Sequence, residues 1–205
     1  MDYLFSQISG LLTMSENGML ELIASITSLY CVYLTVQRNI WCWPVGMIAS
    51  VFCWITFHEA KLYADADLQI YFIAMSVYGW YHWQYGGVAI DDLPVTSTPR
   101  WMWAWILSGT TVVVLAIAVP RALYTDAKIP YIDTWPNVLS VVAQWMLSRK
   151  YIENWILWIV VDVILIVIYM WQDLRFLAFT YAIFLCLATK GLLDWRRTMV
   201  AQAKS

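Results

Sequence analysis

The chain has 205 residues, of which 62% are hydrophobic and only 13% are charged. Soluble globular domains carry about 25% charged residues, so this composition excludes an ordinary soluble domain. The formal net charge is −2, from 12 Lys and Arg against 14 Asp and Glu, which leaves no basic surface to neutralise the phosphates of a nucleic acid. This composition and net charge indicate a protein whose partner is the lipid bilayer and not nucleic acid.

Seven apolar runs follow one another along the chain, each about long enough to cross ~30 Å of hydrocarbon as a helix. We expect an all-α polytopic membrane protein with spans near residues 19–36, 40–57, 68–83, 101–119, 134–147, 155–171 and 176–193. Residues 1–18 mix apolar and polar side chains without a basic leader, which favours a segment that lies in the membrane interface. The longest and most polar connections, 84–100 and 120–133, flank the fourth run.

Lys and Arg are unequally distributed between the two sides of this arrangement. Eight lie on the side of the C-terminus and four on the other side. Because cytoplasmic loops are enriched in Lys and Arg, we expect the N-terminus outside and residues 196–205 as a cytoplasmic tail.

An internal repeat relates the two halves of the sequence. Adding one constant number to the residue numbers of Trp43, Gly79 and Trp83 gives Trp155, Gly191 and Trp195. We call this constant number the repeat offset. Three spans reverse the direction of the chain and a fourth restores it, so two three-helix repeats, 19–83 and 134–195, would run parallel, with 84–133 as loops and a linker helix. This 3+1+3 parallel-repeat (SWEET-like) arrangement is typical of carriers whose substrate site lies near the bilayer midplane.

The strongest candidate for chemistry is Asp162, an acid in the middle of the apolar run 155–171. A carboxylate at bilayer depth costs at least ~2.5 kcal/mol, so it should face a protected interior. At helical spacing Trp155, Trp158 and Tyr169 share its face. Aromatic ring faces and a counter-charge together suit a flat organic cation. The alternative is that the aromatic residues pack and that Asp162 is a structural hydrogen-bonding centre.

Further side chains could complete such a site. Asn137 and Gln144 lie on one face of the fifth run, and a buried amide can both donate to and accept from a ligand. Trp43 begins an aromatic stripe in the second run, and Gln69 lies near the start of the third. Core packing, interhelical hydrogen bonding or solvation explains several of these residues equally well.

The patterns required by other functions do not occur in the sequence. His58 and His82 have no Cys or acidic partners at metal-ligand spacing, and the four Cys show no CxxC spacing. There is no Gly-rich phosphate loop and no nucleophile elbow. We therefore expect no metal, no cofactor and no enzyme activity. A seven-helix receptor or sensor is the alternative from another class, although a receptor does not need a parallel repeat.

Four segments in order carry a resemblance to a known family. They are 39–46 (NIWCWPVG), 61–63 (KLY), 78–83 (YGWYHW) and 148–158 (SRKYIENWILW). These segments resemble the motifs of the Pnu family of bacterial vitamin transporters, and the likeness extends over about residues 19–195.

The resemblance implies a seven-helix carrier of the bacterial inner membrane whose site is lined by Asn154, Trp155 and Trp158. It implies facilitated diffusion of an unphosphorylated vitamin, which a cytoplasmic kinase then traps by phosphorylation; assembly with a second copy is left open. The family includes carriers for nicotinamide riboside, with relatives for thiamine and riboflavin. Nicotinamide riboside and thiamine both carry a cationic aromatic ring, so Asp162 favours them over neutral riboflavin. We expect nicotinamide riboside, with thiamine as the alternative.

Overall fold

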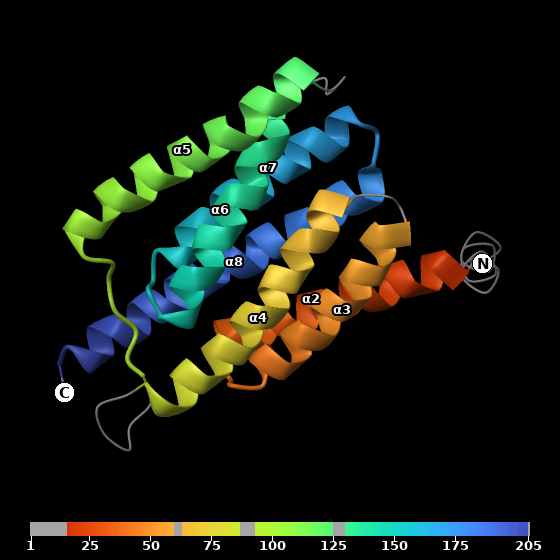
Figure 1. Ribbon diagram of the computed structural model, residues 1–205. Helices are drawn as coiled ribbons and strands as arrows, with labels where there is room; N and C mark the ends of the chain where they lie inside the picture. The colour runs from red at the N-terminus through yellow and green to blue at the C-terminus, as the bar shows by residue number, and fades with distance from the viewer. Residues whose placement is uncertain (1–15, 60–62, 87–92, 125–129, 205) are drawn as a thin grey trace.

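The computed structural model describes residues 16–59, 63–86, 93–124 and 130–204. Seven α-helices run through these residues, as the apolar runs predict (Figure 1). They are α2 (Glu16–Val36), α3 (Cys42–Glu59), α4 (Tyr63–Tyr85), α5 (Arg100–Tyr124), α6 (Pro130–Ser148), α7 (Asn154–Trp171) and α8 (Arg175–Gln202). The last helix continues past the predicted span end at 193. The predicted interfacial segment 1–18 lies outside the described residues, except for 16–18, which begin α2.

Among the described residues, three helices are by themselves long and apolar enough to cross a membrane. These stretches are Arg100–Ile117, Asn154–Trp171 and Arg175–Gln202, while Leu22–Val36 forms a shorter apolar helix. The bundle also exposes many large apolar side chains, among them Leu107, Val112 and Val167. An apolar outer surface with backbone hydrogen bonds satisfied inside helices is the solution that a bilayer requires. Among the remaining helices, α4 and α6 carry polar residues such as Gln69 and Asn137 that line cavities inside the bundle.

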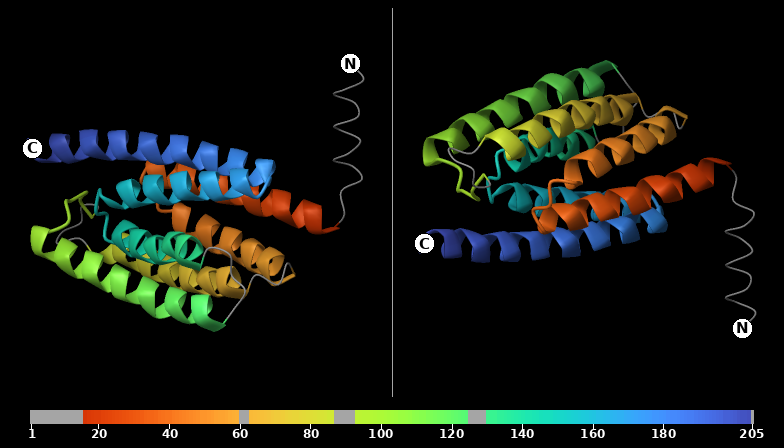
Figure 2. Two further views of the ribbon diagram at one scale, coloured as in Figure 1. Left: turned by 90° about the horizontal axis from the view of Figure 1, so that it is seen from above. Right: turned by 90° about the horizontal axis from the view of Figure 1, so that it is seen from below.

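Six of the helices form a closed ring. Contacts run from α2 to α3, α3 to α4, α4 to α6, α6 to α7, α7 to α8 and from α8 back to α2. Helix α5 packs on α6 and stays outside this ring, and both views in Figure 2 place it at the edge of the bundle. The first residue of α2 and the last residue of α8 lie at opposite ends of the bundle (Figure 1).

The helix bounds follow the repeat offset that the sequence suggests. Shifted by this offset, both bounds of α3 fall on those of α7, the start of α4 falls on the start of α8, and the end of α2 falls on the end of α6. The turns that end α2 and α6 are also the same. Arg38 and Lys150 adopt left-handed backbone conformations with φ of 57° and 52°. The amides that follow them donate to Leu34 and Met146, each at 3.0 Å, as in a helix-terminating turn.

A chain of four tryptophan rings forms the centre of the main hydrophobic core. Trp43 and Trp83 meet edge to face at 5.2 Å, Trp83 and Trp195 lie 6.1 Å apart, and Trp195 meets Trp155 edge to face at 5.4 Å. Trp83 donates from Nε1 to the carbonyl of Leu147. We call these four residues the tryptophan chain. Its two halves are related by the internal repeat.

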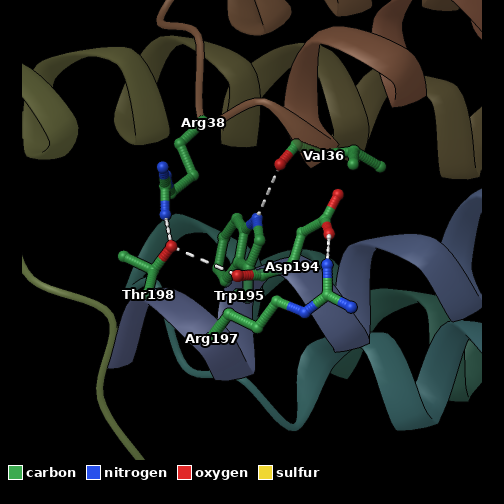
Figure 3. Close-up of polar contacts among 6 residues, drawn as sticks. All are labelled: Val36, Arg38, Asp194, Trp195, Arg197 and Thr198. Carbon is green, nitrogen blue, oxygen red and sulfur yellow. Dashed lines mark hydrogen bonds and ion pairs between the residues drawn. The ribbon is translucent and has the colours of Figure 1, made fainter. Parts of the chain in front are cut away.

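Hydrogen bonds from the second half of the chain to the first hold the tryptophan chain in place. Trp195 donates from Nε1 to the carbonyl of Val36 at 3.2 Å (Figure 3). On the same helix Thr198 accepts a hydrogen bond from Arg38, and Asp194 pairs with Arg197 at 3.6 Å. Because Trp195 is fully buried, its N–H needs such a partner.

An extended segment before α5 forms hydrogen bonds at the end of the bundle where the tryptophan chain lies. Thr96 forms an isolated parallel bridge with Tyr151. Thr98 donates from its amide and its hydroxyl to Oε2 of Glu153, at 2.9 and 2.8 Å. The amide of Val95 donates to Gln202 at the end of α8. The segment before α5 is therefore fixed both to the connection between α6 and α7 and to the end of α8.

Candidate substrate site

A cavity of about 230 Å³ lies inside the ring, lined by residues from all six of its helices. It is smaller than the ~300–1,000 Å³ typical of sites for drug-sized ligands, so it suits a small molecule. The cavity brings together six of the nine residues singled out in the sequence, namely Trp43, Gln69, Gln144, Trp155, Trp158 and Asp162.

Asp162 provides the only carboxylate among the described residues that line this cavity. It lies in the middle of α7, and only 4% of its surface is exposed. Within the described ranges no hydrogen bond or ion pair reaches its side chain. An acid so placed in a membrane helix is a candidate functional residue, because a buried charge is stabilised only by a partner.

The two tryptophans of α7 have different surroundings. Trp155 is 2% exposed, belongs to the tryptophan chain and lies against Gly191, where an added Cβ would be 2.6 Å from its ring. Trp158 is only partly buried, lies one helical turn from Asp162, and has Phe72 at a centroid distance of 6.3 Å. Its ring is therefore the more accessible stacking surface for a ligand.

Amide and indole groups add hydrogen-bonding capacity to the cavity. Gln69 of α4 and Gln144 of α6 both line it. So do Trp43 and Trp155, whose buried Nε1 atoms find no acceptor in the described part of the chain. A buried donor without a partner costs about 1–3 kcal/mol. The amides of Gln69 and Gln144 are the groups that can both donate to and accept from a ligand in the cavity.

Three of the predicted site residues do not line the cavity. Asn154 is fully buried at the start of α7, where Nδ2 donates to the carbonyl of Tyr151 at 2.6 Å. Asn137 donates from Nδ2 to Asp65 at 3.2 Å and so links α6 to the start of α4. Tyr169 packs against the ring of Tyr181 at 5.3 Å. These residues support helices that line the cavity.

Other cavity residues were not selected from the sequence. Tyr181 and Phe184 of α8 line the cavity, as do Gly46 and Ser50 of α3. The repeat offers a signal that could have found the α8 residues, because Tyr181 is the repeat counterpart of Gln69 and both face the same cavity. Hydropathy alone could not identify them, since α8 is apolar along most of its length.

A second cavity of about 500 Å³ lies between α4, α5 and α6. Its lining is almost entirely apolar, with Asn137 as its one amide among the described residues. That described lining lacks a charged group and an aromatic cluster, so the smaller cavity inside the ring is the better candidate for recognition of a polar substrate.

Apolar helices around a buried, partly polar cavity define a multi-pass membrane transporter. The comparisons with known proteins agree with this class. The chain matches the nicotinamide mononucleotide transporter family over residues 18–197. It therefore belongs to that family of vitamin transporters of the inner membrane, the Pnu family that the sequence motifs resemble, and it is a carrier and not an enzyme.

Curated relatives cover most of the chain. It is 28% identical to the nicotinamide riboside transporter PnuC of Escherichia coli over an alignment of 201 positions, which covers 86% of this chain and 84% of that protein. It is 27% identical to the riboflavin/roseoflavin transporter RibM of Streptomyces davaonensis, over 85% of this chain and 83% of the relative. A crystal structure of the vitamin B3 transporter PnuC superposes with a TM-score of 0.73 at 20% identity, covering 89% of this chain and 83% of the other. That similarity establishes the fold.

Proposed function

We propose that this protein takes up an unphosphorylated, cationic aromatic vitamin, and that nicotinamide riboside is its substrate. The observation that carries the proposal is the placement of Asp162 and the ring of Trp158 in one cavity inside the helix ring. A cationic pyridinium stacked on Trp158 would supply the missing partner of the buried carboxylate. The relatives named as nicotinamide riboside transporters support this assignment.

The lining of the cavity favours the riboside over the phosphorylated mononucleotide. Its described lining residues include no Lys, Arg or His. A phosphate carries nearly two negative charges and is normally bound by such cations or by a helix N-terminus. Next to Asp162 a phosphate would meet repulsion without compensation, so the substrate enters without it.

The same lining supports transport by facilitated diffusion. The cavity has one carboxylate among its described residues and lacks the cluster of oxygen ligands that a coupling cation would use. Direction would then come from metabolism, through a cytoplasmic kinase that phosphorylates the vitamin. The phosphorylated product would be retained because it no longer fits the cavity.

Thiamine is the second candidate, since its thiazolium ring is also cationic and aromatic. The relative named as a riboflavin transporter indicates that the family fold accepts other vitamins. Riboflavin itself is neutral and has a large tricyclic ring system, so a cavity of about 230 Å³ with a buried acid suits it least.

We further propose the 3+1+3 arrangement, with α2–α4 and α6–α8 as parallel repeats and α5 as linker. The closed ring of six helices, the exclusion of α5 and the repeated helix bounds support it. The excess of Lys and Arg on the side where α8 ends supports an outside N-terminus and a cytoplasmic C-terminus.

Competition binding tests the proposed substrate. Purified protein should bind labelled nicotinamide riboside, and unlabelled riboside should displace it. Nicotinamide mononucleotide and riboflavin should compete at least about a hundredfold less well, a difference of ~2.7 kcal/mol. Stronger competition by thiamine than by the riboside would move the assignment to thiamine. Equal competition by the mononucleotide would refute the argument from the missing cations.

A further inference from the structure

The two halves of the molecule contribute unequal sides to the cavity, although their helices repeat. Most of the lining residues have a repeat counterpart that also lines the cavity. In three of these pairs the second half carries the larger or more polar side chain, namely Val32 with Gln144, Gly46 with Trp158, and Ser50 with Asp162. In three others the first half carries the more polar side chain, namely Thr35 with Leu147, Gln69 with Tyr181, and Ser76 with Ala188. At the first three pairs the first half therefore leaves space where the second half supplies a ring, an amide and an acid.

The space beside Gly46 is closely bounded. A Cβ added to Gly46 would lie 3.0 Å from Sγ of Cys31 and 3.7 Å from Oγ of Ser76. Any side chain at this position must displace a neighbour or occupy part of the cavity. The absence of a side chain at Gly46 therefore determines how much volume the first half offers to a ligand.

Polar groups surround this space on the side of the first half. Ser50, Gln69 and Ser76 are all buried and line the cavity. The hydroxyl of Ser76 donates to the carbonyl of Phe72 at 2.8 Å, which leaves its oxygen able to accept. The side chains of Ser50 and Gln69 can both donate and accept. Uncharged hydroxyl and amide groups of this kind are suited to an uncharged, hydroxyl-rich group.

We propose that Gly46 and Ser50 are specificity-determining residues that hold the sugar of a nucleoside-type substrate, while Trp158 and Asp162 hold its cationic base. This inference rests on the proposed function and adds the orientation of the substrate. The base lies toward α7 and the sugar toward α3, because the α3 side combines the space beside Gly46 with the hydroxyl of Ser50 and is next to the polar side chains of Gln69 and Ser76. A ligand without a sugar uses the second half alone.

Two pyridinium probes that differ in the sugar test the inference. Nicotinamide riboside carries the ribose, and N-methylnicotinamide has the same cationic ring with a methyl group in its place. Affinities are measured by competition binding on the full-length purified protein. In Gly46→Ala and in Ser50→Ala the affinity for nicotinamide riboside should fall by about tenfold, whereas that for N-methylnicotinamide should change less than about twofold.

Two further variants separate cavity volume from helix packing. Gly109→Ala is the matched control, because an added Cβ there has no atom within 4 Å, and it should bind both probes like the wild type. In the double variant Gly46→Ala, Cys31→Ala the nearest neighbour of the new methyl group is removed, and the selective loss for the riboside should persist. Recovery of riboside binding in the double variant would show that Gly46 serves only to pack against α2.

Equal losses for both probes, or no loss for the riboside, would overturn the inference. If the wild type bound neither probe, the proposed function itself would be contradicted. If the wild type bound the riboside but the variants failed to distinguish the probes, only the assignment of the sugar side would be wrong.

Discussion

Asp162 is a buried carboxylate without a partner among the described side chains, in the middle of a membrane-spanning helix. Such a group is expensive to keep unless something compensates its charge. The described residues that line its cavity provide aromatic and neutral polar groups but no Lys, Arg or His, so under the proposed function the ligand supplies the cation that compensates its charge. The central question about this site is therefore whether its substrate is a cation.

Removing that charge should weaken binding selectively. In Asp162→Asn the affinity for nicotinamide riboside should fall by about tenfold or more, since ~1.4 kcal/mol is a factor of ten and charge pairs are strong in a low-dielectric cavity. The affinity for reduced, uncharged nicotinamide riboside should hardly change. Asp194→Asn is the control, because Asp194 pairs with Arg197 away from the cavity. Equal losses for both ligands would make Asp162 a structural residue.

The partly buried ring of Trp158 should contribute to binding without being essential for folding. Trp158→Ala should weaken binding of nicotinamide riboside by about 1–2 kcal/mol, and Trp158→Phe should retain part of the affinity because a ring face remains. Trp171→Ala, on the same helix but highly exposed, serves as the control in the same titration. Unchanged binding in a folded Trp158→Ala protein would remove this ring from the site.

Packing at the element scale depends on two glycines that accommodate tryptophan rings. A Cβ added to Gly79 would overlap the ring of Trp43, and one added to Gly191 would lie 2.6 Å from the ring of Trp155. The same device occurs in both halves, at positions related by the repeat offset. It explains why α4 can lie close to α3 and α8 close to α7 at the end where the tryptophan chain lies.

Alanine at either glycine should therefore destabilise the protein. Overpacking of this kind costs about 1–3 kcal/mol, so Gly79→Ala and Gly191→Ala should each lower the midpoint of thermal unfolding in detergent. Gly109→Ala places its methyl group in open space and should leave the midpoint unchanged or raise it, because Ala favours the helix by about 1 kcal/mol. A midpoint for Gly191→Ala equal to that of Gly109→Ala would contradict the packing argument.

The sequence was most informative where hydropathy and close packing determine the structure. Seven apolar runs predicted seven helices, and the Gly and Trp pairs gave the repeat because these residues contact each other in each half. Helical periodicity predicted which face of a helix a residue occupies, but it was less informative about how far along the helix axis the residue lies from the cavity. Tyr169 shares the face of Asp162 but lies two helical turns further, about 10 Å along the helix axis. It packs against Tyr181, which lines the cavity, but does not line the cavity itself. Asn137 lies at a similar distance from Gln144 and contacts Asp65 instead.

Contacts between the halves were beyond the reach of a single sequence. The cavity residues Gly46, Tyr181 and Phe184 come from helices that look like ordinary apolar segments. The partners of Trp83 and Trp195 are backbone carbonyls in the opposite half, and backbone acceptors leave no signature in residue types.

In the proposed arrangement the molecule consists of two repeated halves, which enclose a small cavity with a single buried acid among its described lining residues. Such an arrangement can expose a central site to either side of the membrane by moving one half against the other. The described residues of the cavity provide no second charge for a coupling ion. We therefore expect the vitamin to move only down its own concentration gradient.

Uptake of labelled nicotinamide riboside into proteoliposomes distinguishes facilitated diffusion from ion-coupled transport. With no energy source, the wild type should equilibrate the riboside until its concentrations inside and outside are equal, and a proton or sodium gradient should not change that end point. Asp162→Asn should slow the uptake, and Asp194→Asn should not. If the riboside accumulated above the outside concentration under an imposed ion gradient, facilitated diffusion would be contradicted. If the wild type took up no riboside, the proposed substrate would be contradicted.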